Sequence, residues 1–273
     1  MRKPLFSLIV IALFFSSCKK DDDPAAENWY LTRLIDVYEA RNDTTFISYN
    51  ADNTFKESRF SYIHNDAPAF NAFGAVYEGD KITGIQMWSN SMPERHTITS
   101  IQYTGNLVTI ADQEVYDREQ AKWVINSHDS LVYAGGKLAE LYANYKNGST
   151  TFYKLTWEGD NVKSYECYSK QTGTEYVLFQ TFNYTYDAKP AFHRMLTGNY
   201  YWLADITNFT YLSANNVTKA DMIRQPEGTV ETSRTNTFIY NGEGLLTSIA
   251  TREESVYLES AKNYTTVLEY TKR

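Results

Sequence analysis

The chain has 273 residues, of which 42% are hydrophobic and 15% aromatic, and its formal net charge is −7 at pH 7. A negative balance disfavours nucleic-acid binding, which needs a basic surface. The only cysteines, Cys18 and Cys167, are too few for a disulfide scaffold. A chain of this length can bury a sizeable core, and all-β domains often reach this size as one unit.

The first residues predict a secretory signal. A basic Arg2-Lys3 pair, an apolar run over 5–15 and two small serines precede Cys18. The run is shorter than the about 20 apolar residues of a membrane-spanning helix. The segment resembles a bacterial lipoprotein signal, which implies that residues 1–17 are removed and that Cys18 carries the lipid. Several acyl chains at one residue suffice for stable anchoring in a membrane.

A charged run follows the cysteine directly: Lys19, Lys20, Asp21, Asp22 and Asp23. It resembles the export signal of Bacteroidota surface lipoproteins, which implies a lipid-anchored protein on the outer face of the outer membrane. Such a run cannot pack, so residues 18–28 are also expected to form a disordered acidic tether. The periplasmic face of the membrane stays as the alternative location.

After residue 29 the chain repeats one phrase: an aromatic residue, a short turn rich in Gly, Asn and Asp, and then an apolar residue. The phrase recurs every 24 to 30 residues, starting at Tyr49, Tyr77, Tyr103, Tyr133, Trp157, Tyr186, Tyr211 and Tyr240. Gly, Asn and Asp tolerate the positive φ of hairpin turns, and flanks such as 176–186 and 264–270 alternate with a period of two. We therefore expect residues 29–273 to form a single all-β domain. It would be an antiparallel meander of repeated hairpins with about 14–17 strands, strongly curled or closed into a barrel-like sheet.

The Tyr-x-Gly-x-x-Leu/Ile/Val turns, the stretches 184–192 and 212–219 and the ending 268–273 resemble a known family. It consists of Bacteroidota lipoproteins of unknown function with a porin-like fold, whose hairpins are similar to tyrosine-aspartate (YD, Rhs-type) repeats. The resemblance covers roughly residues 30–273. It implies a porin-like β-meander in the cell envelope and supplies no catalytic residues.

Strands of this length could also build a transmembrane barrel. The alternation, however, predicts Lys154, Arg234 and Glu269 on the outer surface, where lipid requires apolar side chains. We therefore expect a soluble barrel held by its anchor. Two segments interrupt the rhythm: Phe192 to Leu203 is expected to be irregular or a short helix, either capping the sheet or packing as an aromatic corner, and His64 to Phe73 is expected to be a loop.

The sequence offers little catalytic chemistry. The histidines His64, His96, His128 and His193 do not have the spacing of metal ligands, and neither a phosphate-binding loop nor a nucleophile elbow is present. We predict that the protein is not an enzyme and uses no metal or cofactor. Cys167, in a strand-like context, is expected to be a buried, inert thiol.

The aromatic supply is the main resource for binding, because 23 Tyr, 14 Phe and 5 Trp can stack on sugars or line an apolar cavity. The candidate ligand-binding residues are Trp88, Trp123, Trp157, Trp202, Tyr200 and Tyr201. Two three-residue stretches also resemble O-glycosylation sites of Bacteroidota secreted proteins, with Thr44 and Ser130 as acceptors.

Three functions are compatible with these features. The first is a non-enzymatic module at the outer-membrane surface that binds a ligand, a glycan or an outer-membrane protein. The second is a periplasm-facing structural or carrier module that encloses an apolar ligand. The third is an envelope hydrolase, which would need acidic or His side chains converging in a cleft.

Overall fold

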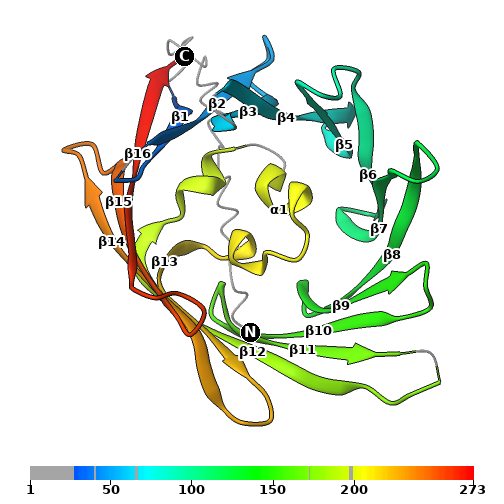
Figure 1. Ribbon diagram of the computed structural model, residues 1–273. Coiled ribbons are helices and arrows are strands. Elements are labelled where there is room, and N and C mark those ends of the chain that lie inside the picture. The colour runs from blue at the N-terminus through cyan, green and yellow to red at the C-terminus, as the bar shows by residue number, and fades with distance from the viewer. Residues whose placement is uncertain (1–27, 40, 65–66, 172, 197–198) are drawn as a thin grey trace, which may run out of the picture.

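Sixteen antiparallel strands close into one barrel (Figure 1). The computed structural model describes residues 28–39, 41–64, 67–171, 173–196 and 199–273. Each strand pairs with its neighbours in the sequence, and β1 (Trp29–Val37) pairs with β16 (Lys262–Lys272) to complete the ring. The expected all-β meander is confirmed, and closure leaves none of these strands at an open sheet edge.

The strands between these two follow in chain order. They are β2 (Asn42–Tyr49), β3 (Phe55–His64), β4 (Ala67–Glu78), β5 (Lys81–Ser89), β6 (His96–Thr104), β7 (Leu107–Asp117), β8 (Lys122–Ala134) and β9 (Lys137–Tyr145). The second half holds β10 (Thr150–Glu158), β11 (Asn161–Lys170), β12 (Val177–Pro190), β13 (Asn215–Arg224), β14 (Thr229–Tyr240) and β15 (Leu246–Ser255).

The sequence repeat marks one structural position that occurs eight times around the ring. An aromatic residue at the end of one strand lies opposite an apolar residue near the start of the next, and one extra residue then bulges from the second strand. The pairs are Leu31 with Tyr270, Tyr49 with Phe55, Tyr77 with Ile82, Tyr103 with Val108, Tyr133 with Leu138, Trp157 with Val162, Tyr186 with Val217 and Tyr240 with Leu246. Glycines at positive φ, such as Gly79 at +64° and Gly159 at +54°, allow the tight turns beside two of them.

Hydrogen bonds join six of these eight positions to the preceding one. The hydroxyl of Tyr103 donates to the carbonyl of Ile82 at 2.8 Å, which is the apolar residue of the hairpin before it. The same bond recurs for five further aromatics, namely Tyr49 to Leu31, Tyr77 to Phe55, Trp157 to Leu138, Tyr186 to Val162 and Tyr270 to Leu246. The repeat therefore encodes a ring of side-chain bonds at one end of the barrel, which we call the turn end. The opposite end is the loop end.

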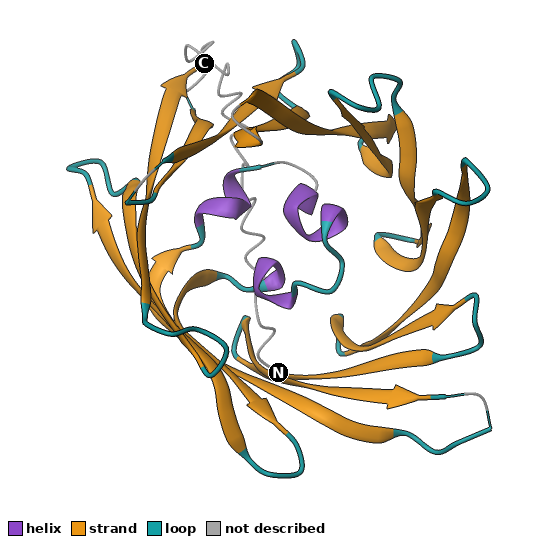
Figure 2. Ribbon diagram, viewed as in Figure 1, coloured by secondary structure: helices purple, strands orange, loops and turns teal. Residues whose placement is uncertain are grey.

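A segment between β12 and β13 fills the centre of the ring. Its described residues form the short helices η1 (Phe192–Met195), α1 (Tyr200–Ala204) and η3 (Phe209–Leu212), which lie inside the circle of strands (Figure 2). We call residues 191–214 the plug. The expectation of an irregular or helical segment here is confirmed, although it occupies the lumen and does not cap a sheet. A sixteen-stranded ring is too wide for its wall side chains to fill, so a plug completes the core.

The plug is fixed to opposite walls. The ring of Tyr200 stacks on Phe55 of β3 with centroids 3.6 Å apart, and its hydroxyl lies 2.9 Å from that of Ser58. On the other side Phe209 packs edge-on against Tyr153 and Tyr165 of β10 and β11.

Polar side chains hold the point where the plug joins the wall. Asn216 donates to the carbonyl of Pro190 at 3.1 Å and accepts from the amide of Phe192 at 3.1 Å. Tyr240, unlike most of its counterparts in the ring, donates to the carboxylate of Asp187. Both chain ends of the plug are therefore tied to the turn end.

The structure corrects three details. The segment His64 to Phe73 is not a loop, because β3 extends to His64 and β4 begins at Ala67. Tyr211 belongs to η3, and Tyr270 supplies the eighth ring position in its place. The expected alternation over 176–186 breaks at a bulge opposite Cys167, so Tyr176 stacks edge-on against Phe152 while Phe179 packs on the core.

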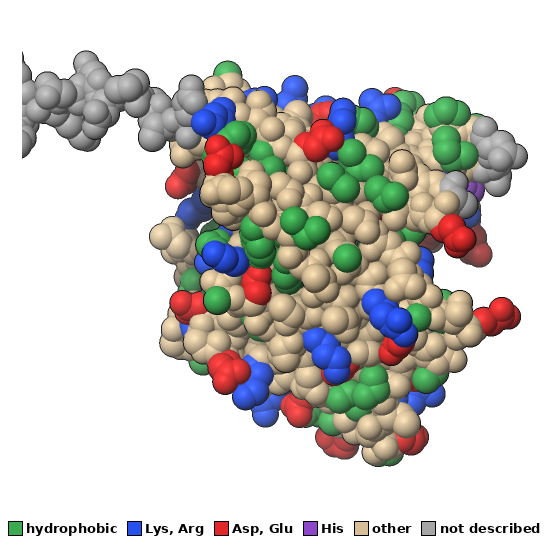
Figure 3. Space-filling model, turned by 90° about the vertical axis from the view of Figure 1, so that its left-hand side faces the viewer, with side chains coloured by type: hydrophobic (Ala, Val, Ile, Leu, Met, Phe, Trp, Pro, Cys, Tyr) green, Lys and Arg blue, Asp and Glu red, His purple; other side chains and the backbone are tan. Residues whose placement is uncertain are grey.

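The two faces of the wall differ in character. The lumen face is largely apolar and buries residues such as Ile85, Leu141 and Val162. The outer face carries charged groups, including Lys154 and the Arg33–Glu269 ion pair at 3.1 Å, and Figure 3 shows cationic and anionic side chains dispersed over one side of it. In the part of the chain that the structure describes, no helix is long and apolar enough to cross a membrane.

We predict that removal of one ring hydroxyl destabilises the barrel measurably. Tyr103→Phe leaves the carbonyl of Ile82 without its side-chain donor and should lower the free energy of unfolding by about 1 kcal/mol. Tyr133→Phe is the matched control, because Tyr133 holds the equivalent register position and no such carbonyl bond is seen for it among the described residues. Urea denaturation checks both variants, and equal losses would contradict the role of the bond.

Candidate functional site

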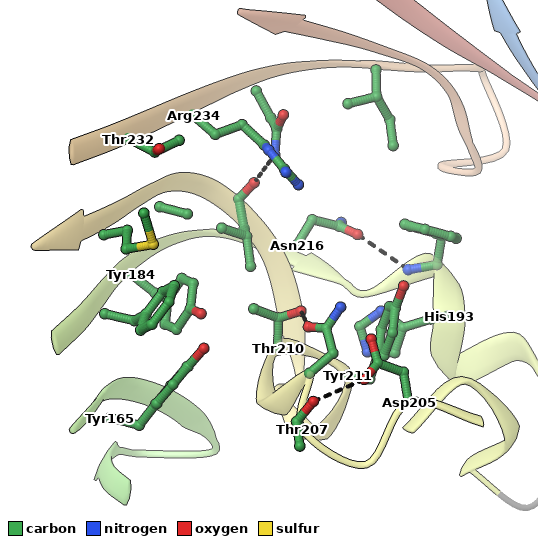
Figure 4. Close-up of a pocket in the computed structure, with 18 of the residues that line it drawn as sticks. Tyr165, Tyr184, His193, Asp205, Thr207, Thr210, Tyr211, Asn216, Thr232 and Arg234 are labelled. Carbon is green, nitrogen blue, oxygen red and sulfur yellow. Dashed lines mark hydrogen bonds between the residues drawn. The ribbon is translucent and has the colours of Figure 1, made fainter. Parts of the chain in front are cut away.

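The main candidate site is a cavity of about 520 Å³ between the plug and one side of the wall (Figure 4). Strands β11 to β15 supply the wall, and residues of η1, of η3 and of the segment before η3 supply the opposite side. Its lining mixes aromatic rings with polar and charged groups, including Tyr165, Tyr184, His193, Asp205, Tyr211, Asn216, Thr232, Arg234 and Asn236. Pockets of this volume are typical of small-molecule sites.

The ring positions determine which wall side chains face the cavity. Tyr240 points into the lumen, so the alternating residues before it on β14, Phe238, Asn236, Arg234 and Thr232, line the cavity as well. On β15 the bulge after Leu246 shifts the alternation by one residue. Ile249 therefore faces the cavity. Glu253 lies four residues further along the same face, beyond the cavity lining, and pairs with Arg234.

Arg234 is the cation of the site. Its guanidinium contacts the carboxylate of Glu253 at 3.3 Å, and the two side chains are 50% and 24% exposed. The prediction that Arg234 lies on the outer surface is wrong, because its side chain lines the cavity. Lys154 and Glu269, predicted with it, do face outward.

His193 enters the cavity from η1. Burial lowers its pKa from the ordinary 6.5 to about 4, so the ring is neutral at neutral pH. The ring is edge-on to Tyr211 with centroids 5.3 Å apart. Its Nε2 atom is buried and has no hydrogen-bond partner among the described residues. The ring therefore adds a neutral surface to the cavity, and its Nε2 atom is not open to a ligand there.

Aromatic rings form the inner part of the cavity. Tyr165 and Phe182 stack with centroids 4.5 Å apart, and the rings of Tyr165 and Tyr184 lie 6.0 Å apart. Burial raises the pKa of Tyr165 and Tyr184 well above their ordinary value and that of Tyr211 to about 12. All three phenols therefore stay protonated and uncharged under physiological conditions.

The plug contributes the acidic group of the site. Asp205 lies just after α1 and accepts from the hydroxyl of Thr207 at 3.0 Å. Asp205 raises and Arg234 lowers the pKa of Tyr211, so the phenol lies within reach of both charges. Opposite charges thus face the cavity from its two sides.

The aromatic residues proposed from the sequence do not form one site. Tyr200 and Trp202 belong to the core of the plug, 2% and 4% exposed, and Trp202 donates to the carbonyl of Ile206. The hydroxyl of Tyr201 is buried without a partner among the described residues. Trp157 is one of the repeat aromatics that form the ring of side-chain bonds at the turn end. Together with Trp202 it lines a second recess of about 590 Å³ at that end.

The other two tryptophans lie elsewhere. Trp88 covers Gly74, where an added Cβ would come within 3.2 Å of the indole, and Arg95 stacks 4.0 Å above the ring. Trp123 stacks on His96 with centroids 4.1 Å apart. Ligand binding at these six residues stays a prediction.

The structure also locates the cysteine and the two glycosylation candidates predicted from the sequence. Cys167 is 3% exposed, and burial raises its pKa to about 12, which agrees with an inert thiol. Thr44 and Ser130 are half-buried within β2 and β8, and their glycosylation stays a prediction. Cys18 and the charged run Lys19, Lys20, Asp21, Asp22 and Asp23 lie outside the described residues.

Sequence reasoning did not identify Arg234, Asp205 or His193 as one group. The sequence did carry a signal for Arg234. It precedes Tyr240 by three pairs of residues, so the period-two alternation of a strand places both side chains on the same face. No comparable signal marks Asp205 or His193, since their positions depend on how the plug folds. Among the described residues no three His, Cys, Asp or Glu side chains gather as a metal site would require.

We predict that His193 makes stability depend on acid pH. The unfolded chain binds a proton below about pH 6.5 while the buried ring stays neutral to about 4, so stability falls as pH drops through this window. The loss should reach about 2 kcal/mol near pH 5. Urea denaturation of the wild type and of His193→Gln checks this, and the variant should show a shallower acid slope. Identical slopes would contradict a buried neutral His193.

Solved structures include chains that are similar to this one. The chain is similar to a porin-like protein from Bacteroides uniformis, with 12% identity, a TM-score of 0.54 and coverage of 88% of this chain and 96% of that one. It is also similar to a porin-like protein from Bacteroides vulgatus, with 10% identity, a TM-score of 0.42 and coverage of 89% and 99%. No family model and no curated protein matches the sequence. At such identity the likeness to the first structure shows the fold alone, a porin-like closed barrel.

Proposed function

We propose that the protein is a lipid-tethered component of the cell envelope that binds a small ligand inside its barrel and does not convert it chemically. The observation that carries this proposal is the cavity between plug and wall. Its polar groups face an interior space, where an unoccupied hydrogen-bonding group has a cost that a ligand or ordered water can offset.

The plug supports binding over conduction. It spans the lumen from Tyr200 against β3 to Phe209 against β10 and β11, through contacts buried on both sides. A porin conducts through a polar, water-filled interior, whereas most of this lumen is packed with apolar side chains.

The termini support an orientation on the membrane. Asn28 and Arg273 exchange backbone hydrogen bonds of 3.2 and 3.1 Å, and both lie at the turn end. A lipid on Cys18 would therefore direct the turn end toward the bilayer and the loop end away from it. The charged outer wall, with pairs such as Arg33–Glu269, suits contact with water. We favour the outer surface of the outer membrane, and the periplasmic face is the second candidate.

The anchor is tested on the full chain in a Bacteroides host. Cys18→Ser should move the protein from the membrane fraction to the soluble fraction, because it removes the attachment atom of the lipid. Protease treatment of intact cells then locates the wild type: digestion indicates the outer surface, whereas protection indicates the periplasmic face. An unchanged membrane fraction for Cys18→Ser would refute the anchor.

The cavity is tested with the neutral fluorescent probe N-phenyl-1-naphthylamine. The purified barrel should bind it with enhanced fluorescence, and Ala220→Phe, which fills the cavity between Tyr184 and Arg234, should weaken binding more than tenfold. Ala250→Phe is the matched control, since Ala250 is exposed on the neighbouring strand β15. If the probe does not bind, or if both variants bind equally well, the lumen is not a ligand site.

A further inference from the structure

The charges around the cavity constrain what can occupy it. The guanidinium of Arg234 has five N–H donors, and its one ion pair, with Glu253 at 3.3 Å, engages a single nitrogen. On the plug, the carboxylate of Asp205 receives one donor, the hydroxyl of Thr207, on one of its oxygens. N–H donors of Arg234 on the wall thus face the carboxylate oxygens of Asp205 on the plug across the cavity (Figure 4).

The ring of His193 lies in the same lining, and burial keeps it neutral, so it adds no charge. Its Nε2 atom is itself buried and is not open to the cavity. Asn236 contributes its amide to the same lining, with its nitrogen donating to the carbonyl of Val217 at 2.8 Å.

These groups disfavour the two simplest kinds of ligand. A purely apolar ligand can pack on the aromatic rings but leaves the hydrogen-bonding capacity of Arg234 and Asp205 unmet, so it should bind less tightly than a ligand that also bonds to them. An anion would find the cation Arg234 already paired with Glu253, and the carboxylate of Asp205 on the opposite side. An uncharged molecule that both donates and accepts can bond to the wall and to the plug without bringing an unpaired charge into the lumen.

The aromatic wall narrows this class. The stacked Tyr165 and Phe182, together with Tyr211, provide an apolar surface beside the polar groups. Sugars combine the two properties, because the C–H faces of a pyranose ring pack on aromatic rings while each hydroxyl on its rim donates and accepts. A cavity of about 520 Å³ has room for one or two such rings.

We infer that the lumen cavity binds a short neutral saccharide, a mono- or disaccharide. Arg234 and Asp205 hold its hydroxyls from opposite sides, and the Tyr165–Phe182 wall packs on its ring. This inference rests on the proposed lumen binding function and names its ligand class. It also differs from the apolar cargo that the sequence allows for a carrier.

The test screens saccharides by saturation-transfer difference NMR against the whole barrel domain. The panel holds the methyl glycosides of glucose, galactose, mannose, N-acetylglucosamine, rhamnose and xylose, with maltose, cellobiose and lactose. At least one member should bind. Calorimetry should then show binding weakened about tenfold or more by Arg234→Gln and by Asp205→Asn, as expected for a lost charged hydrogen bond. Lys154→Gln, on the outer wall, is the matched control and should bind as the wild type does.

The outcomes separate this inference from the function beneath it. If N-phenyl-1-naphthylamine binds the lumen and no saccharide does, the saccharide assignment falls while lumen binding stands. If neither binds, both fall. Saccharide binding that ignores Arg234→Gln and Asp205→Asn would also overturn the assignment. The probe itself should still bind both variants, which shows that they fold and keep the cavity.

Discussion

The bond from a repeat aromatic to the carbonyl of the preceding hairpin, made at six of the eight positions, is the contact on which the arrangement of the hairpins depends. A hairpin alone fixes only its own two strands. The hydroxyl of Tyr103 reaches beyond its own hairpin to Ile82, so it joins one hairpin to the one before it. The same link recurs around the wall. The pair Leu31–Tyr270 repeats the register between the two ends of the chain, which is why the meander closes.

The same contact determines what the lumen must contain. Because each aromatic points inward, one residue in two along each strand follows it toward the axis. The ring is then too wide for these side chains to meet, and the plug supplies the missing core. The plug enters where the ring pattern is altered: Tyr240 donates to Asp187, and Asn216 joins both chain ends of the plug to the wall. Its bulk packs toward β3, β10 and β11, so a space remains against β13 and β14.

Much of the fold could be read from the sequence, because the repeat places the hairpins directly. A strand number of about 14–17 and the antiparallel order follow from the spacing of the aromatic residues and their turns, and the irregular segment at 192–203 follows from the interruption of that spacing. The face of a given residue was harder to predict, since bulges shift the alternation. Phe179 turned inward for this reason. Arg234 was assigned to the wrong face because the alternation along its strand was followed without a residue of known orientation. Tyr240 in the same strand is such a residue, since its side chain points into the lumen. Asp205 and His193 were beyond such counting, since short helices with little periodicity position them.

The two ends of the barrel therefore have separate duties. The turn end holds the ring of carbonyl bonds, both termini of the barrel and both ends of the plug, so the contacts that define the fold are concentrated there. The loop end carries none of these constraints, and its connections can vary without disturbing the register. The Arg234–Glu253 ion pair is half exposed on the side of Arg234, and such a pair adds little to the stability of a fold. The position of Arg234 beside a cavity and opposite Asp205 therefore fits the proposed recognition of a polar molecule better than a role in the stability of the barrel.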